Sequence, residues 1–203
     1  MKRALLMLAC LAAPLPAAAG ALSDLLMAPR AFDGAAVGSV VAYAEERDVP
    51  EAEGMTVADV TGGEVRLEVV GPDELRLVRV VDGKAQPAGT FPGGTANPLL
   101  LYFLENVVRA MAEATGGSPY YIRNRIREAL VAADLGAAEG ETRTARLTPF
   151  AADRERARMG AFGDLEIRLR YDPADPARIL ELSADTTGDA GGYHERMTLV
   201  AED

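Results

Sequence analysis

Two helix-forming segments at residues 97–133 stand between runs of residues that alternate like β-strands, and this order limits the folds open to the chain. An Asn-Pro pair at 97–98 and a Ser-Pro pair at 118–119 each combine a helix-capping residue with a proline suited to the first helical position. A Gly-Gly pair at 116–117 separates the two segments and is typical of a helix end. The sequence therefore predicts an αα-hairpin with a short glycine hinge.

Alternating segments lie on both sides of this hairpin. In residues 63–71, GEVRLEVVG, apolar and charged side chains alternate, and residues 164–172, DLEIRLRYD, do the same. A period of two places apolar residues on one face of a strand and charged residues on the other. A weaker strand at 84–91 contains Pro87, which favours a sheet edge, and the shift in alternation near Val78 predicts a bulge.

Strands grouped before and after a helical pair favour an α+β fold over a doubly wound α/β fold, in which strands and helices would alternate. We expect an antiparallel β-sheet of about seven to eight strands, with the αα-hairpin of about 97–133 inserted and packed on one face. The sequence contains no linker-like segment, so residues 22–203 are predicted to form a single globular domain.

Residues 1–19 have the three parts of a secretory signal peptide. A charged start, a short apolar run and two prolines precede small residues that allow cleavage after Ala19 or after Ala21. A lipoprotein interpretation, with Cys10 acylated, is less consistent because the better cleavage site follows that cysteine. The apolar run is too short to span a bilayer, which takes roughly 20 residues. We therefore expect export to the periplasm, or alternatively to the extracellular space, with no transmembrane segment in the mature chain.

Removal of this leader makes the chain more acidic and free of cysteine. Lys+Arg falls from 21 to 19 against 31 Asp+Glu, so the mature net charge is −12. The chain's one cysteine leaves with the leader, which excludes a disulfide in the mature protein. Such an acidic protein is a poor binder of nucleic acid or of anionic lipid surfaces. Its richness in alanine, glycine and arginine is typical of bacteria with GC-rich genomes.

Few residues are available for enzyme chemistry. His194 is the only histidine, which excludes a two-histidine metal site, and the absence of cysteine from the mature chain excludes thiol nucleophiles. The segment DTTGDAGG at 185–192 resembles a calcium loop only loosely. No metal and no cofactor are predicted. Paired carboxylates remain possible in a chain with 31 acids, although the sequence singles out no pair.

The helical hairpin carries the candidate binding residues. Apolar residues of the first helix recur at helical spacing, so they either seal a core or line a pocket for a fatty or isoprenoid chain. Two arginines of the second helix could recognise a phosphate or carboxylate, or could form a solvated face paired with acids. Two tyrosines of the same helix could add stacking or hydroxyl contacts, or could be core aromatics that cap the hinge. The candidates are Leu100, Phe103, Val107, Met111, Tyr120, Tyr121, Arg123 and Arg127.

These features favour a non-enzymatic periplasmic protein. We expect it to bind an apolar ligand, such as a lipid, or an envelope protein partner, and to act in cell-envelope assembly or maintenance. The alternatives are a periplasmic hydrolase that uses paired carboxylates and a structural partner subunit that docks through its helical hairpin. An enzyme should show acids converging in a cleft, whereas a carrier should show a continuous apolar cavity.

Overall fold

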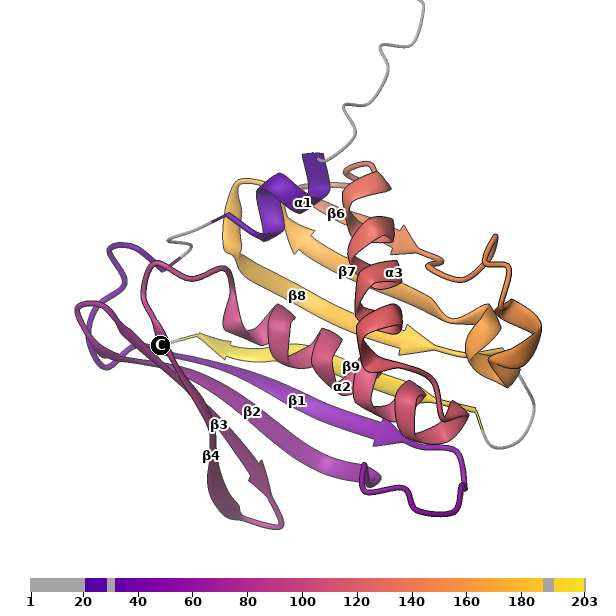
Figure 1. Cartoon of the computed structure of the whole chain (residues 1–203). Helices are drawn as coiled ribbons and strands as arrows, with labels where there is room; N and C mark the ends of the chain where they lie inside the picture. Colours follow the sequence, from indigo (N-terminus) through magenta and orange to yellow (C-terminus); the bar gives the residue numbers. More distant parts are fainter. Residues whose placement is uncertain (1–20, 29–31, 188–191, 203) are drawn as a thin grey trace, which may run out of the picture.

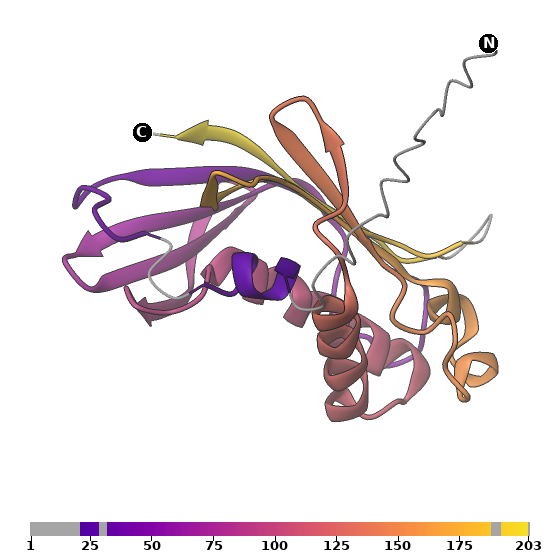
Figure 2. The same ribbon diagram turned by 90° about the horizontal axis from the view of Figure 1, so that it is seen from above.

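The computed structural model describes residues 21–28, 32–187 and 192–202. Within these ranges the protein is built around one antiparallel sheet of nine strands, and its helices lie on the concave side of that sheet (Figures 1 and 2). The predicted α+β class with an antiparallel sheet is confirmed. The strand number is slightly higher than the expected seven to eight because one strand of three exposed residues, AAE, carries no alternation that a sequence could reveal.

The strands are β1 Val40–Asp48, β2 Val60–Gly71, β3 Glu74–Val81, β4 Lys84–Pro92, β5 Ala137–Glu139, β6 Thr142–Leu147, β7 Glu166–Asp172, β8 Asp175–Asp185 and β9 His194–Glu202. Their order in the sheet is β4-β3-β2-β1-β9-β8-β7-β6-β5. The last strand therefore lies between β1 and β8 and joins the strands that precede the helical hairpin to those that follow it. Along one edge β9 meets β1, which is remote in the sequence, and along the other it meets β8, the strand directly before it.

The helices are α1 Ala21–Leu26, α2 Pro98–Thr115 and α3 Pro119–Ala132, with two 3-10 turns, η1 Arg156–Arg158 and η2 Gly160–Asp164. The α2 and α3 helices form the predicted hairpin, and they pack against β8 and β6 (Figure 1). No helix in the described ranges is long and apolar enough to cross a membrane. The predicted leader, residues 1–19, lies outside the described residues and stays a prediction.

Local signals at the hairpin act largely as the sequence indicates. The Asn97 side chain accepts a hydrogen bond from the Leu99 N–H at 3.0 Å, which caps α2. Gly116 ends α2 with a φ of +66°, in the left-handed region that glycine enters without a steric cost. Ser118 differs from the expectation, because its side chain makes no capping hydrogen bond to α3.

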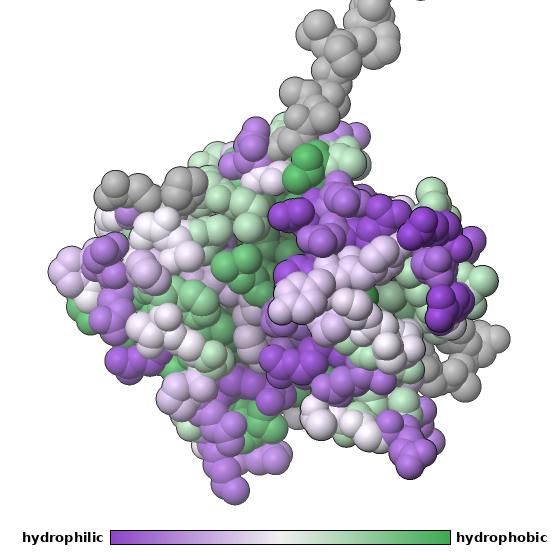
Figure 3. Space-filling model, viewed as in Figure 1, coloured by the Kyte–Doolittle hydropathy of each residue, from purple (hydrophilic) through white to green (hydrophobic). Residues whose placement is uncertain are grey.

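The sheet also follows its sequence signals. The strand that contains Pro87 lies at the sheet edge, where the missing N–H of proline costs no ladder hydrogen bond. The pairing register of β3 with β4 shifts between Leu77 and Val78, which places the predicted bulge. Polar residues dominate the surface over α3, while apolar residues show between α1 and the helical hairpin (Figure 3).

Candidate functional site

A groove of about 640 Å³ runs between α2 and the β3–β4 hairpin, with one residue of β1 and one of α3 completing its walls. Its lining combines an apolar side with several arginines. The lining residues are Arg47, Leu77, Arg79, Gln86, Pro87, Ala88, Phe91, Leu101, Tyr102, Glu105, Asn106, Arg109 and Arg123.

Positive charge gathers in this groove although the chain as a whole carries a net charge of −10. Four arginines line it against a single glutamate, Glu105. They come from four different elements, β1, β3, α2 and α3, so only the folded chain brings them together. Guanidinium groups bind carboxylate and phosphate oxygens through paired N–H donors, so an acidic group is the natural occupant of such a groove.

A buried network of charges lies behind the groove. Arg47 has a side-chain exposure of 6%, and its Nη2 donates to Glu45 and, at 3.0 Å, to Glu195. Arg79 donates from Nε to the second oxygen of Glu45 at 2.8 Å. Glu45 and Glu195 themselves are fully buried. Each charge has an opposite charge beside it, as burial in a low dielectric requires.

The Glu195 carboxylate is held by three kinds of donor. Besides Arg47, it accepts the Tyr193 hydroxyl and, at 2.9 Å, the side-chain amide of Asn106 from α2. Burial raises the pKa of Glu195 above its ordinary value, while the guanidinium and the two other donors oppose the rise. Burial likewise raises the pKa of the Tyr193 hydroxyl, so that tyrosine stays neutral and acts as a donor.

The outer part of the groove is formed by exposed charges on the helical hairpin. Arg123 of α3 donates to Glu105 of α2 through three hydrogen bonds of 2.9–3.2 Å, and both side chains are 46% exposed. Arg109, one helical turn beyond Glu105, takes part in no hydrogen bond or ion pair of the described residues. The charge of Arg109 contributes to lowering the pKa of Glu113, whose carboxylate accepts hydrogen bonds from the N–H groups of Thr56 and Val57.

The structure separates the apolar residues predicted for the site from the groove. Leu100, Phe103 and Val107 are 0% exposed and Met111 is 1% exposed, and all four belong to the core between the helices and the sheet. The groove is lined instead by other residues of α2, such as Leu101 and Tyr102.

The tyrosines and arginines of α3 that were predicted for the site lie in different surroundings. Arg123 lines the groove and lies over the ring of Tyr120, which is 77% exposed, at 5.8 Å from its centroid. The Tyr121 hydroxyl donates to Asp153 at 2.8 Å and so holds the loop before η1 against α3. Arg127 is exposed and lines none of the cavities described here.

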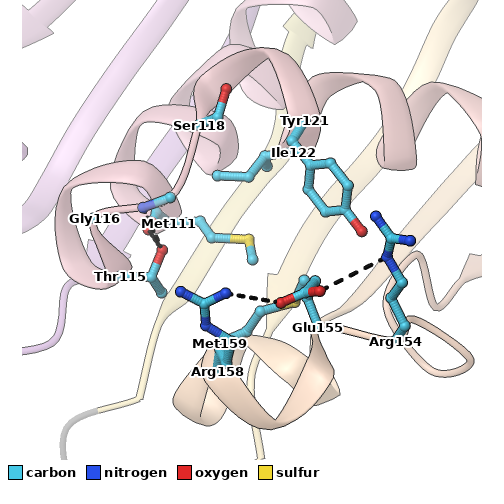
Figure 4. Close-up of a pocket in the computed structure, with 11 residues that line it drawn as sticks. Met111, Thr115, Gly116, Ser118, Tyr121, Ile122, Arg154, Glu155, Arg158 and Met159 are labelled. Carbon is cyan, nitrogen blue, oxygen red and sulfur yellow. Dashed lines mark hydrogen bonds and ion pairs between the residues drawn. The ribbon is translucent and has the colours of Figure 1, made fainter.

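A second cavity of about 480 Å³ lies between the α2–α3 hinge and the η1–η2 segment (Figure 4). Met111, Ile122 and Met159 form its apolar floor. At its opening, Glu155 lies between Arg154 and Arg158, at 3.7 Å and 3.0 Å. The two arginines share this one carboxylate, so the lining of this cavity carries a smaller excess of positive charge than the lining of the groove.

Sequence reasoning missed the residues beneath the groove, although a signal for them was present. In β1 the alternation that buries Tyr43 continues inward through Glu45 and Arg47. The same phase joins Tyr193, the residue just before β9, to Glu195 within β9. Charged residues at inward positions of a strand are rare enough to mark a buried polar site.

Comparison with known proteins gives no further guide to this site. The sequence matches no known protein family and no curated protein. Within the described residues, no group of three or more His, Cys, Asp or Glu side chains could hold a metal ion. Of the segment 185–192, residues 188–191 lie outside that part of the chain.

Proposed function

We propose that this protein is an exported, non-enzymatic binding protein that holds an amphiphilic ligand, an apolar chain with an acidic head group, in the groove between α2 and the β3–β4 hairpin. The observation that carries the proposal is the composition of the groove. Its apolar side, with Leu77, Phe91 and Leu101, lies next to four arginines. A hydrocarbon chain gains about 0.8 kcal/mol for each CH₂ that leaves water, and the arginines supply the polar end with donors.

The position of the acids supports binding rather than hydrolysis. Glu45 and Glu195 are a buried pair of carboxylates that share Arg47, and neither lines the groove. Both are at most 1% exposed, so neither carboxylate reaches a water nucleophile or a leaving group in the groove. A general acid or base must lie within hydrogen-bond reach of the substrate atom that it serves.

The predicted leader supports a place for this function in the cell envelope. Residues 1–19 have the form of a signal peptide, and an amphiphile that crosses an aqueous periplasm needs its apolar chain covered. A protein of this kind would serve envelope assembly or maintenance. A groove open to solvent also lets an acidic ligand enter and leave without unfolding the hairpin.

Two arginines of the helical hairpin offer a matched test. Arg109 lines the groove and Arg127 does not, yet both are exposed and neither takes part in an ion pair of the described residues. We expect Arg109→Ala to weaken dodecanoate binding about tenfold, because one charge-assisted contact is lost. Arg127→Ala, with the same change in net charge, should leave the affinity within a factor of about two.

The measurement is isothermal titration calorimetry at low ionic strength with dodecanoate, and with dodecanol as a ligand of the same chain length without charge. Dodecanol binding should respond to neither substitution. If Arg109→Ala and Arg127→Ala weaken dodecanoate binding equally, the loss reports the change in net charge and not a contact in the groove. Failure of the wild-type protein to bind dodecanoate would refute the proposal.

A further inference from the structure

We infer that Glu105 sets the charge of the head group that the groove accepts, so that the groove selects acids with a single negative charge over dianionic phosphate monoesters. The inference rests on the proposed function, because it concerns the ligand of the same groove. Glu105 forms an ion pair with Arg123, and both residues line the groove.

One of the arginines that line the groove makes no hydrogen bond or ion pair within the described part of the chain. Four arginines line the groove. Glu45 and Glu195 neutralise the two inner ones, Arg47 and Arg79, from behind. Glu105 neutralises Arg123 at the outer end. Only Arg109 is left without a hydrogen bond or ion pair among the described residues, so one negative charge completes the set.

Glu105 is placed where it must influence the head group. It lies four residues before Arg109 on α2, and residues at this spacing are neighbours on a helix surface. An acid bound to Arg109 therefore lies within a few ångströms of the Glu105 carboxylate. A singly charged head can turn its oxygens to Arg109, while a second negative charge on the head would meet Glu105 instead of an arginine.

Arg123 cannot easily serve a second charge while Glu105 is present. Three hydrogen bonds hold its guanidinium on Glu105, and its face lies over the Tyr120 ring. A dianion would have to displace Glu105 and leave that carboxylate beside it. Removing the charge of Glu105 frees Arg123, so that two arginines face the head group and a dianion becomes the better match.

The test compares three heads at about pH 8, where a phosphate monoester carries close to −2 charges. Dodecanoate and lauroyl-lysophosphatidylglycerol are the singly charged carboxylate and phosphodiester, and dodecyl phosphate is the dianion. Each is titrated into the wild-type protein and into Glu105→Gln. Glu128→Gln is the matched control, because Glu128 is an exposed glutamate paired with Arg125 on the same hairpin and lies outside the groove.

We expect the wild type to bind the two singly charged ligands more tightly than dodecyl phosphate. Glu105→Gln should gain about tenfold in affinity for dodecyl phosphate and about threefold for the others, because like charges repel at short range. Glu128→Gln should keep the wild-type order. Glu105→Asp, which keeps the charge, should keep it too and shows that an altered fold is not the cause.

Two failures can be told apart. If the wild type binds dodecanoate but Glu105→Gln changes no preference among the heads, the role of Glu105 is refuted and the proposed function stands. If no variant binds any of the three ligands, both fall. A wild-type preference for dodecyl phosphate over dodecanoate would also overturn the inference. If only one singly charged ligand binds, it identifies the head as a carboxylate or a phosphodiester.

Discussion

Replacement of Arg47 by methionine is the sharpest test of the buried network beneath the groove. The substitution keeps much of the side-chain volume but removes the donor that Glu45 and Glu195 share. Both carboxylates are at most 1% exposed, so they would be left as neighbouring buried negative charges. Breaking a buried ion pair from one side costs about 3–5 kcal/mol, and we expect a loss in this range at about pH 8.

The dependence of this loss on pH identifies its cause. Burial already raises the pKa of Glu195 above its ordinary 4.5, and without Arg47 the pKa should rise further. A carboxyl whose pKa is higher in the folded state binds more protons there, so its ionisation destabilises the fold as the pH rises through that window. The stability lost in Arg47→Met should therefore be partly regained when the pH is lowered from about 8 to about 5.

The assay is urea denaturation followed by circular dichroism at both pH values. The control is Arg66→Met, which removes an arginine that is 43% exposed and paired with Glu64, and which should cost no more than about 1 kcal/mol. The double variant with Glu195→Gln should be more stable than Arg47→Met alone at the higher pH. A loss below about 1 kcal/mol for Arg47→Met, or one that is the same at both pH values, would refute the network as a set of ionised buried groups.

Two further predictions concern the helical hairpin. Phe103→Ala should cost about 3–5 kcal/mol in urea denaturation because this side chain is fully buried, whereas Tyr120→Ala, at an aromatic side chain that is 77% exposed, should lie within about 0.5 kcal/mol. A small loss for Phe103→Ala would mean that it borders an open cavity. Hydrogen bonds from Thr56 and from the N–H of Val57 lower the pKa of Glu113, so the stabilisation they give is present above 4.5 and is lost as the pH falls below it. Glu113→Gln should lower the melting temperature at neutral pH and flatten its decline in acid, and equal declines in both proteins would contradict this linkage.

The helical hairpin and the half-buried strands could be predicted because their signals are local. A cap, a first-turn proline and a terminal glycine act within a few residues of one another, and Asn97 and Gly116 do so here. Alternation likewise reports on one strand at a time. The three-residue strand Ala137–Glu139 escaped because it is exposed and its pairing with β6 is its only mark.

The candidate site could be predicted only in part, and Arg123 is the predicted residue that the groove contains. Leu100 and Phe103 lie on the apolar stripe of α2, and from the sequence this stripe could face either a core or a pocket. Periodicity shows which face of a helix is apolar and not what covers that face. The curvature of the sheet decides that question, because the helices fill its concave side and leave the groove to the opposite flank of α2.

The amino-acid sequence by itself determined the α+β class, the αα-hairpin and the edge position of β4, because each has a signal in residues that lie close together in the chain: element order, caps and hinge glycines, and Pro87. The tertiary structure alone decided the site. Arg47 meets Glu195 because β9 pairs with β1, and Asn106 joins them from α2. These residues are separated by long stretches of sequence, and no local rule relates charges on two strands until the sheet sets their register.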